Sequence, residues 1–272
     1  MPPPLHPRFS SIRTPVIGMV HLLPLPGSPR YGGSLSVVRE SMLRDADALI
    51  NGGVHGLMLE NFGDVPFYPA RVPAHTVAHM TALAADLRRR FDAPLGINVL
   101  RNDGLSALAV AHAARADFIR VNVLCGARLA DQGLLHGIAH DLLRERVTLG
   151  AKDSIKVLAD VDVKHSAPLS PRPLTDEVAD TIHRGLADAV VVSGAGTGRT
   201  TDLDKLKAVK SAADGAVPVL VGSGVTATNA AAYAQHADAL IVGTSFKKGG
   251  LAANPVEIDR VRKLVEQIRQ ES

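Results

Sequence analysis

Eight short apolar runs, each followed by a segment with helical spacing, constrain the fold of this chain more than any other feature. Most of the runs lack polar alternation, which is typical of parallel strands covered on both faces. Eight strand–helix units in about 255 residues give roughly 32 residues per unit, the usual size in a (β/α)8 TIM barrel. The runs lie at residues 16–21, 54–60, 95–100, 118–123, 155–164, 189–193, 217–221 and 239–242.

A doubly wound open sheet is the competing arrangement of the same units. Such a sheet normally carries a GxGxxG turn after its first strand, whereas here residues 22–27 read LLPLPG. We therefore predict a closed barrel of the phosphate-binding type. It forms a single domain over residues 14–272, after an extended lead-in at residues 1–13 whose prolines disfavour regular structure. The one sizeable insertion expected is the loop 61–73, whose aromatic residues favour an ordered flap or a partner surface.

Composition excludes several classes of protein. Thirty basic and 27 acidic side chains give a net charge of only +3, and aromatic residues make up 3% with no Trp. A nucleic-acid-binding surface is therefore not expected. The single cysteine, Cys125, excludes an intrachain disulfide and a cysteine-rich zinc site. No apolar run approaches the length of a membrane span, so we expect a cytoplasmic protein without a transmembrane segment.

Polar residues stand at or near the ends of the first five runs. In a TIM barrel the active site gathers at the carboxyl ends of the strands, so these residues are the first candidates for chemistry. The two-residue period of a strand places those of one run on one face. The alternative is a structural network of ion pairs such as Glu60–Arg120 and Lys164–Asp162. The candidates are His21, Glu60, Asn98, Arg120, Asn122, Asp160, Asp162 and Lys164.

Glycine-rich turns follow the last two runs. Backbone N–H groups can approach an anion closely beside glycine, and a following helix start adds a favourable dipole. The loops after strands 7 and 8 are where TIM barrels commonly hold a substrate phosphate, although glycines there can also serve only to turn the chain. The phosphate-binding candidates are Gly222, Ser223, Gly224, Gly243, Thr244 and Ser245.

The segment 193–201, after the sixth run, has three glycines and four hydroxyl side chains. We expect Ser193, Gly194, Thr197 and Gly198 to contact a ligand, with Arg199 as a counter-charge. Flexible glycine-rich loops at this end of a barrel often close over the substrate. A plain connector is the alternative.

Several motifs resemble the BtpA/SgcQ family over nearly the whole chain, from about residue 14 onwards. They are GMVHLLPLPGSP (18–29), ENFGDVPF (60–67), RVNV (120–123), ADVDVKH (159–165) and VGTSFK (242–247). The segment SGAGTG (193–198) also matches a family pattern of Thr/Ser-Gly-x-x-Thr-Gly well. The resemblance implies a TIM barrel near the phosphate-binding barrels. Its name derives from a cyanobacterial factor for photosystem I accumulation, which implies a peripheral association with a membrane complex.

The favoured hypothesis is an enzyme acting on a small phosphorylated metabolite, a sugar phosphate or nucleotide-like compound. The catalytic candidates are Lys164, Asp162, Glu60 and His21, and the other polar residues at the strand ends would bind substrate. A lysine removed from water can act as base or Schiff-base nucleophile, with Asp162 or Glu60 moving protons in lyase, aldolase or isomerase chemistry. A carboxylate beside Lys164 would instead keep it charged as an electrostatic clamp.

Other functions stay open at this point. Hydrolysis or glycosyl transfer would use Glu60 or Asp162 to activate water. No cofactor is predicted, because a divalent metal on His21, Glu60 and Asp162 has no supporting ligand motif. A non-catalytic assembly factor would use the flap at residues 62–68, and a ligand sensor would need no turnover. Barrels often dimerise, but the sequence does not specify a homo-oligomer.

Overall fold

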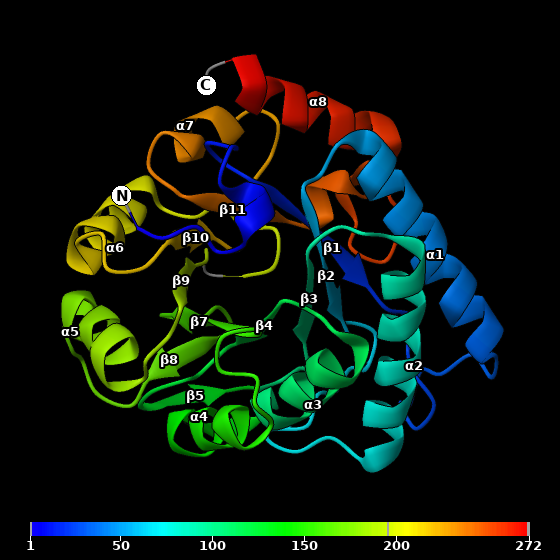
Figure 1. Cartoon of the computed structure of the whole chain (residues 1–272), viewed down its shortest axis with the longest axis horizontal. Helices are drawn as coiled ribbons and strands as arrows, with labels where there is room; N and C mark the ends of the chain where they lie inside the picture. The colour runs from blue at the N-terminus through cyan, green and yellow to red at the C-terminus, as the bar shows by residue number, and fades with distance from the viewer. Residues whose placement is uncertain (1, 195, 271–272) are drawn as a thin grey trace.

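The computed structural model describes residues 2–194 and 196–270, and its centre is a closed barrel of eight parallel strands (Figure 1). Around the barrel the strands follow the order β1-β11-β10-β9-β7-β4-β3-β2. Each barrel strand coincides with one of the eight apolar runs, so the predicted TIM barrel is confirmed. The strands are β1 (Val16–His21), β2 (Gly56–Glu60), β3 (Leu95–Asn98), β4 (Phe118–Val121), β7 (Lys156–Val161), β9 (Ala189–Val192), β10 (Val219–Val221) and β11 (Ala239–Val242).

Helices surround the barrel, as the alternation of segments predicts (Figure 1). In the last of them, Val261, Leu264, Val265 and Ile268 are buried, so the apolar stripe packs inwards. The helices are α1 (Leu35–Gly52), α2 (Ala74–Arg90), α3 (Gly104–Ala114), α4 (Ala139–Thr148), α5 (Leu174–Ala179), α6 (Leu203–Ala213), α7 (Ala230–Ala234) and α8 (Ile258–Gln270). Within the described part of the chain, no helix combines the length and apolar character needed to cross a bilayer.

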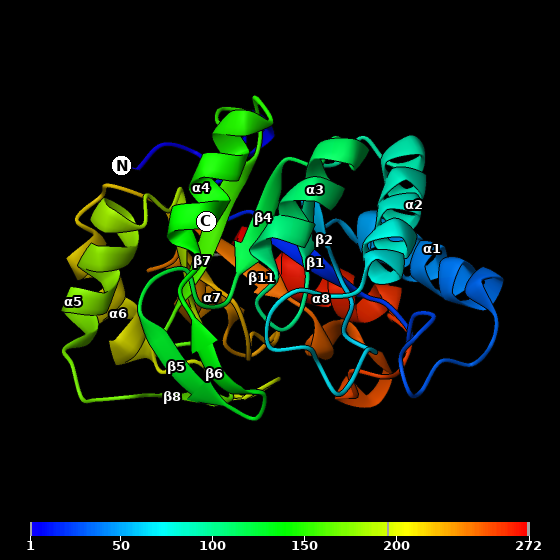
Figure 2. The same ribbon diagram turned by 90° about the horizontal axis from the view of Figure 1, so that it is seen from below.

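A second, antiparallel sheet was not predicted from the sequence. It consists of β5 (Ala127–Ala130), β6 (Gly133–His136) and β8 (Ser166–Pro168), in the order β6-β5-β8. Figure 2 shows it beyond one end of the barrel strands. The expectation that 61–73 is the one sizeable insertion is therefore wrong, because the loops after β4 and β7 also carry added structure.

The N-terminal segment is extended only in part. Pro7–Phe9 form a 3-10 helix (η1), and the side chains of Leu5 and Phe9 are buried. They pack with Ile17, Met58 and other residues in a cluster that is separate from the larger core. The first residues of the chain thus contribute to the hydrophobic interior, which the proline-rich sequence did not indicate.

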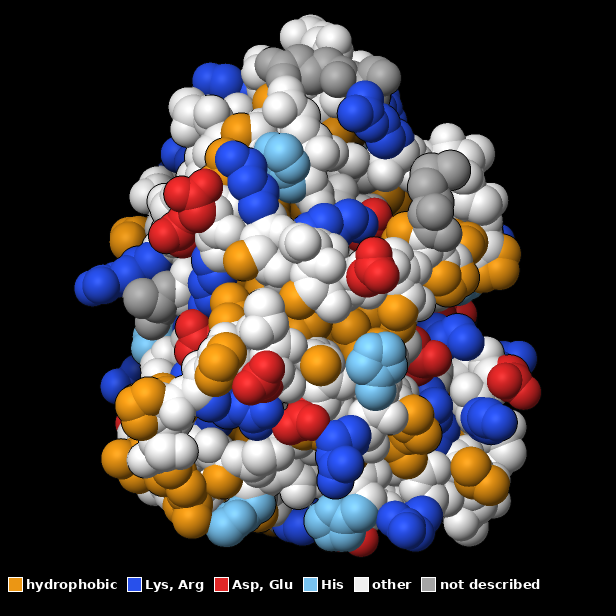
Figure 3. All heavy atoms as spheres, turned by 90° about the vertical axis from the view of Figure 1, so that its left-hand side faces the viewer, with side chains coloured by type: hydrophobic (Ala, Val, Ile, Leu, Met, Phe, Trp, Pro, Cys, Tyr) orange, Lys and Arg blue, Asp and Glu red, His pale blue; other side chains and the backbone are white. Residues whose placement is uncertain are grey.

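Surface charge is mixed on the face that Figure 3 displays. Lys and Arg side chains alternate there with Asp and Glu, and no broad field of one sign is visible. This distribution is in keeping with the small net charge of +3.

Candidate active site

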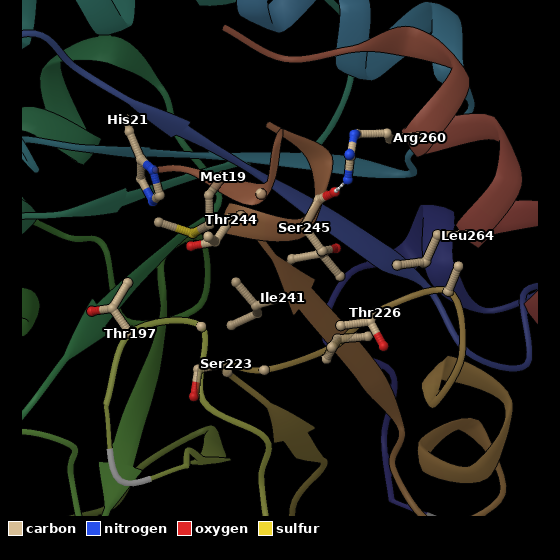
Figure 4. Close-up of a pocket in the computed structure, with 18 of the residues that line it drawn as sticks. Met19, His21, Thr197, Ser223, Thr226, Ile241, Thr244, Ser245, Arg260 and Leu264 are labelled. Atoms are coloured by element: carbon tan, nitrogen blue, oxygen red, sulfur yellow. Dashed lines mark hydrogen bonds between the residues drawn. The ribbon is translucent and has the colours of Figure 1, made fainter. Parts of the chain in front are cut away.

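A cavity of about 540 Å³ lies where the predicted polar residues and glycine turns meet. Its lining includes the candidates His21, Glu60, Arg120 and Lys164 (Figure 4 shows the His21 side). The same cavity is lined by both glycine turns, with the candidates Gly222, Ser223, Gly224, Gly243, Thr244 and Ser245. The ionisable side chains and the glycine turns therefore face one space.

Strand register places four polar side chains at one level of the barrel. His21 of β1 is paired with Glu60 of β2, Glu60 with Asn98 of β3, and Asn98 with Arg120 of β4. Side chains of residues paired in this way project from the same face of a sheet. The sequence could predict this arrangement in part, because His21 and Glu60 end their apolar runs and Asn98 and Arg120 are polar residues within theirs.

Arg120 and Asp160 form the buried ion pair at the centre of this level. The guanidinium donates from Nε at 2.9 Å and from Nη2 at 2.7 Å to the two carboxylate oxygens. Asn122 donates to Asp160 at 2.7 Å, and Ser193 lies 3.3 Å from the same carboxylate. Arg120 thus pairs with Asp160 and not with Glu60, the partner named in the structural alternative, and the polar atoms of the Arg120–Asp160 pair are well satisfied.

Glu60 has different partners. Asn98 donates to its Oε2 at 2.5 Å, and His21 Nε2 lies 3.6 Å from its Oε1. Burial lowers the pKa of His21 well below its ordinary value, and the positive charges of Lys247 and Lys164 add to this effect. A contact with the Ala252 backbone acts in the opposite direction. The imidazole is consequently neutral at pH 7.

The pKa of Lys164, another candidate catalytic group, is also strongly lowered. Burial lowers its pKa from 10.5 to about 8, with a further contribution from the Arg120 charge, while Glu60 and Asp160 oppose the change. Among the residues that the structure describes, no carboxylate lies within salt-bridge distance (4.0 Å) of its amine. The adjacent carboxylate of the clamp alternative is therefore not in salt-bridge contact with Lys164, although Glu60 and Asp160 favour the charged amine.

Asp162 does not join the other catalytic candidates. Its φ of 48° ends the regular alternation of β7, so its side chain leaves the face that Asp160 occupies. It pairs instead with Arg128 and Lys205, each at 2.6 Å. Partial burial raises the pKa of the Asp162 carboxyl, but the contacts with Lys205 and Arg128 outweigh it and hold the pKa below its ordinary value.

The separation of Asp162 also affects the metal hypothesis. The proposed ligand set of His21, Glu60 and Asp162 is not brought together, since Asp162 does not line the cavity. Over residues 2–194 and 196–270, no group of three or more His, Cys, Asp or Glu side chains is placed to hold a metal ion.

The two glycine turns approach neighbouring side chains closely. A Cβ atom on Gly222 would lie 2.4 Å from Val191 Cγ1 and 2.9 Å from Arg120 Nη2, and one on Gly243 would lie 3.0 Å from His21 Cε1. The N–H of Gly222 itself is used, because it donates to the Val192 carbonyl at 2.7 Å. Gly222 therefore allows the close approach of Val191 and Arg120 and does not offer its N–H to a ligand.

A short 3-10 helix follows β11. It spans Thr244–Phe246 (η3), and its N–H bonds begin with Phe246 to the Gly243 carbonyl. The N–H groups of Thr244 and Ser245 precede the first intrahelical bond and have no acceptor within the helix. A short helix after the last strand is the element that holds phosphate in many TIM barrels.

The loop after β9 divides into two parts. Ser193 lies in the Arg120–Asp160 network, and the Gly194 N–H donates to Ser223 Oγ at 2.9 Å. Thr197 and Gly198 line the cavity, and Gly198 approaches Thr244. Ala195, which belongs to the same predicted motif, lies outside the described residues.

A second lobe adjoins the cavity. It contains Arg101, a cationic residue that the sequence did not single out. The lobe has a volume of about 570 Å³, and its lining includes Asn98, Asn122 and Arg101. It shares Glu60, Arg120 and Lys164 with the first cavity. Arg101 belongs to no motif, and only its place shortly after β3 could have marked it. Phe62 was also missed as a site residue, although its ring stacks on His21 at 4.4 Å.

The comparisons with known proteins agree with this architecture. The BtpA family model matches residues 12–270. An uncharacterized protein of Thermococcus kodakarensis is 49% identical over 263 residues, covering 96% of this chain and 98% of that protein. The Photosystem I biogenesis protein BtpA of Synechocystis sp. is 46% identical over 260 residues, covering 95% and 90%.

Among solved structures, a thiamine phosphate pyrophosphorylase from Pyrococcus furiosus aligns with a TM-score of 0.54 and 14% identity. The alignment covers 95% of this chain and 97% of that chain. At this identity the likeness concerns the fold alone. The family match and the two relatives together establish that the chain belongs to the BtpA family.

Proposed function

We propose that this protein is an enzyme that acts on a small phosphorylated metabolite. The observation that carries the proposal is the cavity in which Lys164, without an ion pair, faces the two glycine turns. The neighbouring pyrophosphorylase, which shares the fold, is named for a phosphorylated compound. Lyase, aldolase or isomerase chemistry fits a lysine of this kind.

Lys164 is assigned as the base or the Schiff-base nucleophile. With a pKa of about 8, about half of the amine is unprotonated at mildly alkaline pH, and a smaller fraction at pH 7. Acting as a nucleophile, Nζ would attack a substrate carbonyl carbon, and the carbonyl oxygen would leave as water once the imine forms. Glu60 and His21, 3.6 Å apart, are the groups placed to hold and return the protons.

The phosphate is assigned to the turns after β10 and β11. The N–H groups of Thr244 and Ser245 would donate to it, and the hydroxyl of Ser223 lines the same space. Arg260 and Lys263 of α8 also line this cavity, and Lys263 adds positive charge, whereas Arg260 is paired with Glu257. Helix N-termini and nearby cations are a common combination for phosphate binding.

Thermal-shift screening with sugar phosphates and nucleotides tests the phosphate assignment. A ligand that stabilises the wild type should fail to stabilise Gly243→Asp, because the new carboxylate would enter the cavity beside His21. Gly32→Asp is the matched control, since a Cβ at Gly32 meets no atom within 4 Å. Equal responses from both variants would refute the assignment.

Borohydride trapping tests the lysine. Reduction in the presence of a carbonyl-containing ligand should add its mass to the peptide with Lys164, and Lys164→Met should remove the adduct. A turnover substrate that leaves no adduct would exclude the Schiff base. Base catalysis or glycosyl chemistry with Glu60 would then be the mechanisms to examine.

An assembly role is the second candidate, and the flap at residues 62–68 favours it. Its Val65 and Tyr68 are 37% and 51% exposed, and a relative with 46% identity is named for photosystem I biogenesis. Expression in a Synechocystis strain lacking its own BtpA discriminates the two functions. Rescue of photosystem I by Lys164→Met, with failure of Tyr68→Asp, would favour assembly over catalysis.

Two further expectations accompany the enzymatic proposal. We place the protein in the cytoplasm, where small phosphorylated metabolites and reduced cysteines are both usual. The oligomeric state stays a prediction to be measured by light scattering.

A further inference from the structure

Arg101 differs from the other deeply buried arginines of the described chain. Arg120, Arg128 and Arg146 each face a carboxylate within salt-bridge distance. Arg101 is only 4% exposed, yet within residues 2–194 and 196–270 no carboxylate lies within 4.0 Å of its guanidinium. Its positive charge has no direct partner in the protein.

The hydrogen bonds of Arg101 go to neutral acceptors. Nη2 donates to the Lys164 carbonyl at 2.5 Å, and Nη1 donates to Asn122 Oδ1 at 3.4 Å. Nε is buried without a partner among the described residues. These bonds fix the orientation of the guanidinium but leave N–H donors unused, because an arginine side chain carries five.

Burial of an unpaired charge is costly unless a ligand supplies the counter-charge. Burial lowers the pKa of Arg101, and the more distant charges of Asp160, Asp131 and Glu60 oppose this effect. Arg101 lines the second lobe, which joins the first at Lys164 and Arg120. A single extended ligand can therefore reach both the glycine turns and Arg101.

We infer that Arg101 binds a carboxylate of the substrate, so that the substrate is a phosphorylated carboxylic acid. This inference rests on the proposed function, since it places the phosphate at the glycine turns. Carboxylate suits the second lobe because the planar guanidinium fork matches its two oxygens. Glu60 and Asp131 line the same lobe and would repel a second dianionic phosphate more strongly than a monoanion.

Isothermal titration with matched pairs of ligands tests the inference. The pairs are 3-phosphoglycerate with glycerol 3-phosphate, and 6-phosphogluconate with sorbitol 6-phosphate, which differ in a terminal carboxylate. In at least one pair, the carboxylated member should bind the wild type about ten-fold more tightly or better, as expected for a charge-assisted hydrogen bond. Arg101→Met should bring the two affinities within about three-fold of each other while phosphate binding persists.

Controls separate this result from a general loss of structure. Arg101→Gln is a second variant that keeps an amide donor without the charge, and it should also lose the preference. Arg146→Met removes a similarly buried arginine outside the cavity, and this variant should keep the preference for the carboxylated ligand. A preference that survives in both Arg101 variants would overturn the inference.

The two proposals fail in different ways. Equal affinity within both pairs, with competition by inorganic phosphate, would refute the carboxylate site and leave the phosphate site standing. Failure of all four ligands and of inorganic phosphate to bind would refute the phosphate site, and the carboxylate inference would fall with it.

Discussion

Replacing Lys164 by Met should stabilise the protein at neutral pH. The amine has a pKa of 10.5 when exposed and about 8 in the folded chain, so folding disfavours its charged form. That difference corresponds to about 3 kcal/mol of unfolding free energy. The cost is fully present below pH 8 and disappears as the pH rises from about 8 to 10.5, because the unfolded chain then binds more protons than the folded one.

Urea unfolding of wild type and Lys164→Met, measured at several pH values from 7 to about 10.5, checks this reasoning. The variant should be more stable by up to about 3 kcal/mol at pH 7, and the two should converge at the alkaline end. Lys152→Met, at an exposed lysine, is the control and should change little at any pH. A variant that is less stable than wild type at pH 7, or a gain that does not vary with pH, would refute the argument.

Three other predictions follow from single contacts or groups. Phe9→Ala should lower the unfolding free energy measured in urea by about 3 to 5 kcal/mol, because it leaves a cavity at a buried position. A loss below about 1 kcal/mol would show that Phe9 does not pack in the hydrophobic interior. Asp45→Asn should lower the unfolding free energy by about 3 to 5 kcal/mol in thermal or chemical denaturation, because the buried Lys247 amine, now 2.5 Å from Asp45, would lose its counter-charge. Adding Lys247→Met should recover most of that loss. Once a turnover substrate is known, kcat/KM should rise with pH and level off above about 8 if Lys164 is the base, whereas a fall through the same range would indicate a charged clamp.

The sequence predicts the barrel well because parallel strands buried on both faces leave continuous apolar runs. The antiparallel sheet left no such trace. Its strands have three or four residues, and Leu129 and Leu134 point to solvent rather than to a core. Its strands bury little beyond Leu135 and Arg128, and strands of this length are too short for periodicity to reveal.

The sequence indicated most of the residues that line the candidate site, but it did not indicate which of them pair with one another. Glu60 ends its run and Arg120 lies within its run, and strand register brings them to one level. Asp162 was misplaced because alternation was extended through a residue whose φ is 48°, which no local pattern signals. Arg101 was missed because the absence of a carboxylate partner is a property of the folded neighbourhood.

The antiparallel sheet has a consequence for Lys164. This lysine stands between the end of β7 at Val161 and the start of β8 at Ser166, and β8 is hydrogen-bonded to β5. The four intervening residues therefore span two separately anchored sheets. Both ends of this segment are hydrogen-bonded, so the position of the Lys164 amine is restrained from both sides. Deleting the β5–β6 hairpin should therefore increase the mobility of Lys164 and leave the barrel strands intact.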